Sequence, residues 1–403
     1  MKYAVILGDG MADYPQENLG GKTPLDLAEK PYIDELCARS EVGLCRTVAA
    51  GLKPGSDVAN LSVLGYDPKE CYTGRSPLEA ASIGIELKDT DVTARANLVT
   101  LSDEENYEDK TMVDYSAGEI TTAESKILIN YLAEHLNDGK YRLYSGVSYR
   151  HCLVVDCGKI AGDLTPPHDI TGKPIKDHLP KSKTGEEYLR LMKLSAELLK
   201  THPVNLARVA AGKRPATSLW FWGEGTKPAL QSFTGKYGLK GAMISAVDLL
   251  KGIGKLTGMR VINVAGATGN YDTDFNGKAQ AALTALTDCD FVYVHMEAPD
   301  ECGHHGDAPH KIYSIERIDG VVKTVAEGLK ARGEKFSLLV LPDHPTPLNV
   351  MTHVSDPVPY LLYRSGKDLG VGAKAYNETQ AAATGVFEES GVSLMRKFLE
   401  KAL

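Results

Sequence analysis

Strand-like and helix-like segments alternate at both ends of this chain of 403 residues, and that alternation limits the folds it can adopt. Short apolar runs predict strands at residues 3–8, 260–265, 290–296, 336–341 and 358–363. Amphipathic patterns predict helices at residues 23–40, 242–256, 277–286, 312–331 and 390–402. Strands that alternate with helices in this way form parallel sheets with crossover helices. The sequence therefore predicts a doubly wound, mostly parallel α/β sheet.

The middle of the chain has a different pattern. Residues 92–101 and 151–155 are expected strands with polar alternation, and residues 122–136 are an expected amphipathic helix. A stretch rich in Pro, Gly and Lys then runs over residues 159–185. A loop of this length without regular structure tends to be functional. The middle therefore reads as a smaller α+β domain.

Composition excludes several classes of function. The net charge is −8, so binding to nucleic acid is not expected. No run of 18 apolar residues occurs, so no membrane span is expected, and a strand that begins at residue 3 leaves no room for a signal peptide. The seven cysteines are odd in number and form no C-x-x-C pair, which is typical of a reduced compartment. We expect a cytoplasmic protein that acts on a small molecule.

Carboxylates and imidazoles occur close to the ends of the expected strands. They are Asp9, Asp300, His304, Asp343, His344 and His353. Open α/β sheets place their ligand sites at the carboxyl ends of their strands, so these side chains should meet at one edge. A mixture of carboxylate and imidazole suits zinc, manganese or iron. Six such residues are enough for two metal ions, and the sequence predicts a metalloenzyme.

Each of these residues alone has a plainer explanation. Asp9 could form an Asx-turn, and Asp343 could end its strand in a turn. Asp300 and His304 would lie on one face of a helix, but they could also belong to a solvated loop. Their joint occurrence in one doubly wound half of the chain favours the metal site.

All six candidates fall outside the middle of the chain. One domain that is split in the sequence by an inserted domain explains this layout. We place the discontinuous metal-binding domain at residues 1–87 and 216–403, and the inserted substrate-binding or lid domain at residues 88–215.

Ser56 follows Gly55 and precedes an apolar helical pattern. One interpretation is that its hydroxyl is a helix N-cap with no role in catalysis. The same position also suits a nucleophile, because a helix N-terminus and a metal beside it lower the pKa of a hydroxyl. The N–H groups of a helix N-terminus also bind phosphate. Ser56 is therefore a candidate nucleophile, with capping as the alternative.

Together these pieces resemble the cofactor-independent phosphoglycerate mutases of the alkaline phosphatase superfamily, in their shorter archaeal-type branch. The matching motifs are Gly8-Asp9-Gly10, Gly55-Ser56-Asp57, Gly74-Arg75-Ser76-Pro77-Leu78-Glu79-Ala80, Arg95-Ala96-Asn97-Leu98, Pro299-Asp300 with His304, Asp343-His344, and His353 with Pro357-Val358-Pro359. The resemblance implies an alkaline-phosphatase-like sheet and two metal ions. One ion would be held by Asp300, His304 and His353. The other would be held by Asp9, Ser56, Asp343 and His344.

The resemblance also implies an activity. The chain would be an isomerase of glycolysis and gluconeogenesis that interconverts 3-phosphoglycerate and 2-phosphoglycerate through a phosphoserine, without 2,3-bisphosphoglycerate. Its metal would be manganese, with zinc, cobalt and magnesium as alternatives. The alternative function is a metal-dependent phosphomonoesterase, or a phosphotransferase or kinase acting on another small metabolite such as homoserine. A kinase needs a nucleotide pocket, and the sequence has no G-x-x-x-x-G-K-[ST] motif and no G-x-G-x-x-G after a strand.

The family's inserted domain supplies the groups that hold phosphoglycerate. In this chain the expected substrate-binding residues are Arg150, His151, His168, Asp169 and Lys240. His168 and Asp169 could be a proton-transfer pair for the substrate hydroxyl. Each of these residues could instead be an ordinary surface or core residue. Arg75 and Arg95 are further candidates for binding phosphate or carboxylate.

Overall fold

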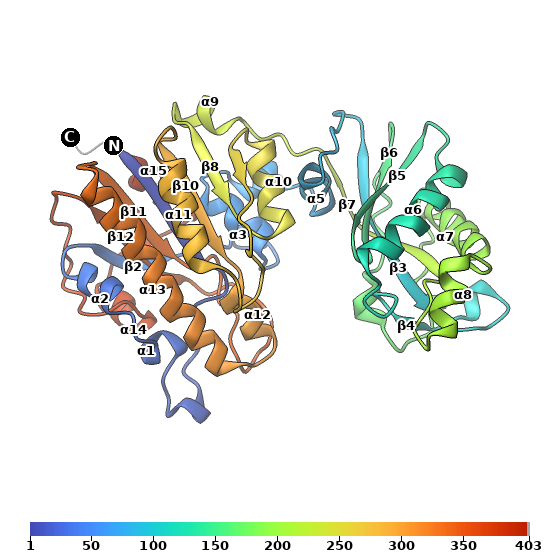
Figure 1. Ribbon diagram of the computed structural model, residues 1–403, viewed down its shortest axis with the longest axis horizontal. Coiled ribbons are helices and arrows are strands. Elements are labelled where there is room, and N and C mark those ends of the chain that lie inside the picture. Colours follow the sequence, from blue (N-terminus) through green and yellow to red (C-terminus); the bar gives the residue numbers. More distant parts are fainter. Residues whose placement is uncertain (401–403) are drawn as a thin grey trace. The chain divides into compact units, whose positions relative to one another are not determined.

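The computed structural model describes residues 1–400, and the chain forms two compact units, shown in Figure 1. Unit 1 contains residues 1–72 and the chain from Ala229 onward. Unit 2 contains residues 73–228.

Unit 2 is wider than the insert that we placed at residues 88–215. Helix α5 (Ser76–Ser82) packs on strands of unit 2. Strand β7 (Ser218–Thr226) pairs along its length with β3 (Val92–Leu101). Because their packing partners lie in unit 2, both flanking segments belong to that unit.

An eight-stranded sheet forms the centre of unit 1, in the order β13-β2-β12-β11-β1-β10-β8-β9. Its strands are β1 (Lys2–Gly8), β2 (Glu41–Cys45), β8 (Gly241–Ile244), β9 (Arg260–Ile262), β10 (Phe291–Met296), β11 (Phe336–Leu341), β12 (Val358–Arg364) and β13 (Phe387–Glu388). The strand β1 is parallel to β10 and β11, and β8 is parallel to β10 and β9. Only β12 runs against its neighbours β11 and β2 within this described sheet. The predicted doubly wound, mostly parallel sheet is confirmed.

Helices cover the sheet of unit 1 on both faces. Every residue of β1 after Lys2 is buried, which requires a layer above and below the strand. One group of helices packs around α13, and α11 lies beside α13 in Figure 1. A second group is formed by α3, α10 and α15. The helices of unit 1 are α1 (Pro24–Leu27), α2 (Pro31–Cys37), α3 (Ser56–Val63), α4 (Pro68–Cys71), α9 (Phe233–Tyr237), α10 (Asp248–Leu256), α11 (Phe275–Ala285), α12 (Ala298–His304), α13 (Ala308–Ala331), α14 (Glu378–Ala383) and α15 (Gly391–Leu399), with the 3-10 helix η1 (Glu17–Leu19).

Two expected helices of unit 1 are wrong in part. Residues 23–40 form two short helices, because Pro31 lacks an N–H and disfavours the helical conformation at Lys30, which has φ −128° and ψ 57°. Residues 242–256 begin with the parallel strand β8, and the helix starts only at Asp248. A short apolar run looks the same in a buried strand and in a buried helix. The helix expected at residues 390–402 is α15, which ends at Leu399. The last two residues of that expectation lie outside the described part of the chain.

Unit 2 is built on an antiparallel sheet of five strands, in the order β4-β3-β6-β5 with β7 beside β3. Besides β3 and β7 these are β4 (Met112–Asp114), β5 (Tyr141–Val147) and β6 (Arg150–Val155). Helices α6 (Thr122–Leu136), α7 (Gly185–Leu199) and α8 (Pro203–Ala210) accompany the sheet, with the 3-10 helices η2 (Tyr107–Asp109), η3 (Pro167–Ile170) and η4 (Lys176–His178). The core lies around Trp220 and Phe221, both fully buried.

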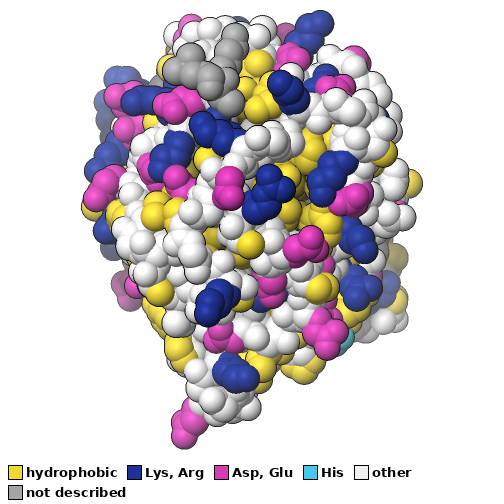
Figure 2. Space-filling model, turned by 90° about the vertical axis from the view of Figure 1, so that its left-hand side faces the viewer, with side chains coloured by type: hydrophobic (Ala, Val, Ile, Leu, Met, Phe, Trp, Pro, Cys, Tyr) yellow, Lys and Arg dark blue, Asp and Glu magenta, His cyan; other side chains and the backbone are white. Residues whose placement is uncertain are grey.

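One face of the molecule carries no broad region of a single charge. Side chains of both signs are interspersed over the face drawn in Figure 2. Within residues 1–400, none of the helices is long and apolar enough to cross a bilayer.

Candidate active site

The carboxyl edge of the parallel strands brings together the first group of polar side chains. Asp9 follows β1, while Asp343 and His344 follow β11, the strand beside it. All three side chains are fully buried. His344 Nε2 lies 3.4 Å from Asp9 Oδ1 and 3.5 Å from Asp343 Oδ2. The sequence predicted this meeting from the strand ends alone.

Ser56 reaches this group from α3, of which it is the first residue. Its Oγ lies 3.2 Å from His344 Nε2. The N-cap of α3 is Gly55, so the alternative reading of Ser56 as an N-cap is wrong. The hydroxyl therefore points at the buried carboxylate and imidazole groups rather than at the helix backbone.

A second group combines Asp300 and His304 of α12 with His353, which precedes β12. His304 Nε2 lies 3.2 Å from Asp300 Oδ2, and His353 Nε2 lies 3.5 Å from Asp300 Oδ1. The two Nε2 atoms are 2.9 Å apart. The Met351 carbonyl lies 3.0 Å from His304 Nδ1 and accepts its proton, which orients the ring so that Nε2 faces Asp300. Asp300 and His304 share one helix face, as their spacing predicted.

The two groups adjoin each other through Asp300. Ligand atoms of Asp9, Asp300 and His344 lie within 4.8 Å of one another. Gly10 allows this close approach because it has no Cβ. A Cβ at this position would lie only 2.5 Å from Asp300 Oδ1, and the φ of 60° also favours glycine. Thr346, which the sequence did not single out, donates a hydrogen bond to Asp300 Oδ1.

Sequence reasoning missed a third group, formed by His295 and Glu297 with Asp9. His295 Nε2 lies 2.8 Å from Asp9 Oδ2 and 3.5 Å from Glu297 Oε2. Ser245 Oγ lies 3.2 Å from the other ring nitrogen, Nδ1. The signal was present, because Glu297 directly follows β10 as Asp9 follows β1. The same argument from strand ends would have found it.

Burial dominates the electrostatics of these groups. Burial, with Asp343 and Glu297 nearby, raises the pKa of Asp9 well above its ordinary value. Burial likewise raises the pKa of Glu297 to about 8. Burial lowers the pKa of His295 to about 3, so this ring is neutral at pH 7.

Asp300 behaves differently from the other carboxylates. Burial alone would raise the pKa of Asp300, but hydrogen bonds from His304 and His353 hold it well below its ordinary value. The same hydrogen bond, opposed by burial, raises the pKa of His304 to about 9. The short contact therefore favours an ionised Asp300 beside a protonated His304 when no cation is bound.

The donor set fits divalent cations. Asp9 Oδ1 is buried and has no hydrogen-bond partner among the described residues. Such an atom carries an unfavourable desolvation penalty unless a cation or proton meets it. In the second group, ligand atoms of Asp300, His304 and His353 lie within 4.8 Å of one another, which is close enough for one cation to meet all three. Carboxylate oxygens with imidazole nitrogens are ligands that manganese and zinc accept.

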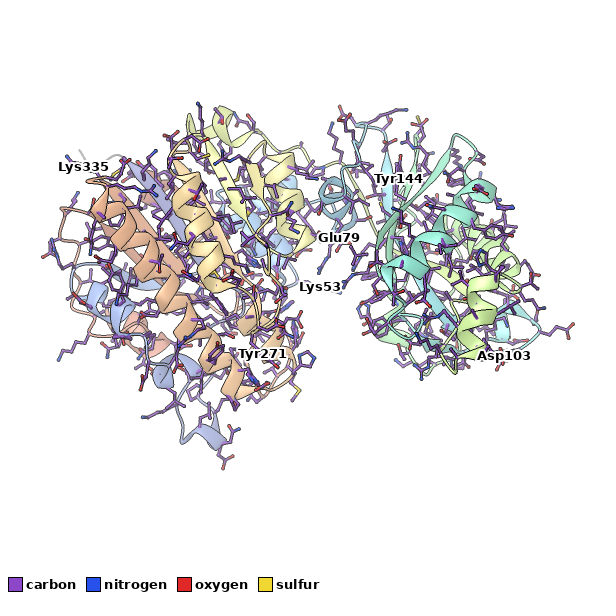
Figure 3. The ribbon with its side chains drawn as sticks, viewed as in Figure 1. Lys53, Glu79, Asp103, Tyr144, Tyr271 and Lys335 are labelled. Carbon is purple, nitrogen blue, oxygen red and sulfur yellow. The ribbon has the colours of Figure 1, made fainter. Side chains whose placement is uncertain are left out.

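Unit 2 carries a cluster of cations around one carboxylate. Arg75 Nε and Arg95 Nε each lie 2.9 Å from an oxygen of Glu79, which projects from α5 and is labelled in Figure 3. Burial opposes ionisation, but Arg95 and Arg75 hold the pKa of Glu79 below its ordinary value. The Arg95 guanidinium also lies 4.0 Å from the centre of the Trp222 ring. Two guanidiniums against one carboxylate leave a local excess of positive charge.

His168 belongs to the same part of unit 2. Its ring centre lies 5.0 Å from that of Trp222, and its Nε2 lies 3.5 Å from Asp169 Oδ1. Burial, with Arg95 nearby, lowers the pKa of His168 despite the neighbouring Asp169. Arg150 adds to the positive field that acts on Glu79. The expected substrate-binding residues His168, Asp169 and Arg150 thus lie in one cluster with Arg95. The sequence had given Arg95 only as a further candidate.

Two expected substrate-binding residues lie elsewhere. His151 is buried in β6, where its Nδ1 accepts a hydrogen bond from the Gly146 N–H at 3.0 Å. Burial lowers the pKa of His151 to about 3, so it stays neutral. Lys240 precedes β8, at the amino edge of the parallel sheet, whereas Asp9 lies at the carboxyl edge. We assign neither residue to the candidate active site.

A mostly parallel α/β sheet with a serine hydroxyl among buried carboxylates and imidazoles has the features of a metal-dependent phosphoryl-transfer enzyme. Comparison with known proteins specifies the class further. The family described as 2,3-bisphosphoglycerate-independent phosphoglycerate mutase matches residues 37–205. A probable enzyme of that name from Geobacter sulfurreducens is 48% identical over 402 residues, which cover 100% of both chains. The enzyme from Methanosarcina barkeri is 49% identical over 383 residues, 94% of this chain and 95% of its own.

Solved structures show the same likeness. A protein from Pyrococcus horikoshii has a TM-score of 0.83 at 30% identity, covering 99% of this chain and 98% of its own. The cofactor-independent phosphoglycerate mutase from Thermoplasma acidophilum has a TM-score of 0.65 at 28% identity, covering 99% of each chain. The chain belongs to the archaeal-type family of 2,3-bisphosphoglycerate-independent phosphoglycerate mutases, which are isomerases.

Proposed function

We propose that this chain interconverts 3-phosphoglycerate and 2-phosphoglycerate through a phosphoserine at Ser56. The observation that carries the proposal is the contact of 3.2 Å between Ser56 Oγ and His344 Nε2, beside the buried Asp9 and Asp343. Full-length identity to phosphoglycerate mutases supports the substrate and weighs against the phosphatase and kinase alternatives.

Two divalent cations fit the donor set. Asp300, His304 and His353 would hold one ion, and Asp9, Ser56, Asp343 and His344 would hold the other. Bound there, the ions would neutralise phosphoryl charge and lower the pKa of the Ser56 hydroxyl. We propose manganese, which the mixed oxygen and nitrogen ligands suit. The seven cysteines are free thiols, which supports a reducing, cytoplasmic location.

The residues of unit 1 then have defined tasks. Ser56 Oγ attacks phosphorus, so an Oγ–P bond forms while the bond from phosphorus to the C3 oxygen breaks. The freed oxygen takes a proton and leaves bound glycerate. In the return step the C2 hydroxyl loses a proton and attacks the phosphoserine, so a bond from phosphorus to the C2 oxygen forms, the Oγ–P bond breaks, and Ser56 Oγ recovers its proton. The N-terminal end of α3 favours the negative charge that gathers at Ser56 in both steps.

Unit 2 supplies the groups that hold glycerate in this proposal. Glycerate must be retained and reoriented while water is kept from the phosphoserine. Arg95 and Arg150 are suited to the carboxylate, because guanidinium groups bind it in a fixed geometry. His168, paired with Asp169, is suited to moving the proton of the substrate hydroxyl.

The covalent intermediate gives a direct test. The enzyme is mixed with 3-phosphoglycerate and manganese, without 2,3-bisphosphoglycerate, and is quenched in acid within milliseconds. We expect mass spectrometry to find one phosphate on the peptide that contains Ser56. Equilibration of the two phosphoglycerates without any such phosphopeptide would refute the mechanism while leaving the mutase activity in place.

A further inference from the structure

We propose that Asn60 is a positioning residue of this active site, which ties the nucleophile-bearing turn of α3 to Asp343, and that Tyr293 fixes the orientation of its amide. The proposal rests on the proposed roles of Ser56 and Asp343. None of these contacts was anticipated from the sequence, where Asn60 is one of several residues inside an apolar helical pattern.

Asn60 makes three hydrogen bonds in a site closed to solvent. Its Nδ2 donates to the Ser56 carbonyl at 2.8 Å and to Asp343 Oδ2 at 2.8 Å. Its Oδ1 accepts a hydrogen bond from the Tyr293 hydroxyl at 2.6 Å. Asn60 and Tyr293 are both fully buried. One side chain thus joins the first turn of α3, the end of β11 and the middle of β10.

Hydrogen-bond chemistry allows only one orientation of this amide. Burial raises the pKa of Tyr293 well above its ordinary value, so its hydroxyl keeps a proton and donates it. Oδ1 of Asn60 must then face Tyr293, and both protons on Nδ2 face the other way. Those two protons match the two acceptors, Ser56 O and Asp343 Oδ2. A flipped amide would set an oxygen against the Asp343 carboxylate.

With the bond from Asn60, both carboxylate oxygens of Asp343 accept hydrogen bonds. Its other oxygen, Oδ1, accepts hydrogen bonds from the Gly10 N–H at 3.2 Å and the His344 N–H at 2.9 Å. Those donors come from the segments that follow β1 and β11, whereas Asn60 comes from the helix that carries Ser56. Asn60 therefore links the first turn of α3, where Ser56 lies, directly to Asp343. Groups that orient ligands in this way commonly change metal affinity about 10- to 100-fold when they are removed.

Two substitutions in the full-length protein test this inference. Asn60→Leu removes both donors, and Tyr293→Phe removes only the proton that orients the amide. Each has a matched control of equal burial and chemistry. Asn205→Leu removes a buried amide of unit 2 that bonds the Leu199 and Ala216 carbonyls. Tyr360→Phe removes a buried hydroxyl of unit 1 that donates to Glu41 at 2.6 Å.

The readouts are calorimetric titration with manganese, the visible absorption of the cobalt-loaded protein, and kcat and KM. We expect the Asn60 and Tyr293 variants to bind one manganese about 10- to 100-fold more weakly, with the other ion unchanged. The cobalt spectrum should change in intensity, and kcat should fall while KM stays within about threefold of the wild type. The two controls should lose melting temperature without any change in metal affinity or spectrum.

The outcomes separate this inference from the proposed function. A wild-type protein that binds no second manganese would overturn the proposed two-ion site, and the inference with it. Two-ion binding by the wild type, with unchanged affinity and spectrum in Tyr293→Phe, would overturn the inference alone. If Asn60→Leu does not fold, Tyr293→Phe decides the question, because it removes one oxygen and leaves the packing of the ring intact.

Discussion

The polar residues of the two units differ in their relation to solvent. In unit 1, Asp9, Asp343 and His344 have no exposed surface. In unit 2, the side chains of Arg75 and His168 are 43% and 47% exposed. A buried group has strong electrostatic effects because water does not screen it. An exposed group can move and can accept a substrate before it is desolvated.

In the proposed function, the two units take different parts of the reaction. Groups that act on the transferring phosphoryl should affect kcat, since they act in the transition state. Groups that hold glycerate should affect KM and the fate of the phosphoserine. Substitutions in the two units should therefore give separable kinetic effects.

The largest effect is expected for Ser56→Ala. Removal of the proposed nucleophile should lower kcat by roughly 10⁴-fold or more, because the proposed phosphoserine could not form. Melting temperature should change little, since Ser56 does not cap α3. The control is Ser62→Ala, which removes a buried hydroxyl from the same helix. Turnover near the wild-type rate in the Ser56 variant would exclude the phosphoserine.

His304→Gln should have the next largest effect. The variant should lose one of two bound manganese ions, measured by elemental analysis after gel filtration, and kcat should fall by roughly 10³-fold. The neighbouring His305 supplies the control, because it bonds only its own helix, at Glu301 O, among the described contacts. His305→Gln should keep both ions. Equal metal loss in the two variants would contradict the assignment of His304.

His168→Ala tests unit 2. Loss of a proton-transfer group typically lowers a rate about 10²- to 10⁴-fold, so the mutase reaction should fall within that range. Ser56 is untouched, so the phosphoserine should still form and should lose phosphate to water. A rise in the ratio of released phosphate to 2-phosphoglycerate is the expected result. Normal isomerisation would remove His168 from the reaction.

Arg95→Met should act on binding rather than on chemistry. Hydrogen bonds to a charged group contribute about 1.5–3 kcal/mol, so kcat/KM should fall about 10- to 100-fold, mainly through KM. The control is Arg142→Met, which breaks the ion pair between Arg142 and Asp91 in the same unit. If Arg95→Met lowered kcat at saturating substrate and left KM unchanged, the proposed assignment of substrate binding to unit 2 and of chemistry to unit 1 would be wrong.

The same contrast explains what could be predicted from the sequence. Strand ends and fixed spacing identified Asp9, Asp300 and His344, because a parallel sheet brings its carboxyl ends to one edge. Residues that act through the packing of distant segments, such as Asn60 and Tyr293, carry no local signal. Antiparallel unit 2 has no common edge of this kind, so sequence order did not separate the buried His151 from the exposed His168.

A partly buried carboxylate outside the candidate metal groups gives the smallest effect. Glu378 accepts hydrogen bonds from the Asp13 N–H at 3.0 Å and the Thr23 hydroxyl at 2.8 Å, yet burial raises its pKa to about 7. Between the unfolded pKa of about 4.3 and this value, the folded protein binds more protons than the unfolded chain. The free energy of unfolding should therefore fall as pH rises through that window, by at most about 3 kcal/mol.

Glu378→Gln removes this titration and keeps the shape of the side chain. Melting temperatures of both proteins with saturating manganese should be compared from pH 5 to pH 8. The titrations of the metal ligands are common to both proteins and cancel in the difference. The wild type should lose stability relative to Glu378→Gln as pH rises, most steeply between the unfolded pKa and the folded pKa of about 7, and the loss should level off above pH 7. A difference in melting temperature that stays constant with pH would mean that the fold does not raise the pKa of Glu378. Burial alone would then not distinguish the carboxylates of unit 1 from the exposed groups of unit 2.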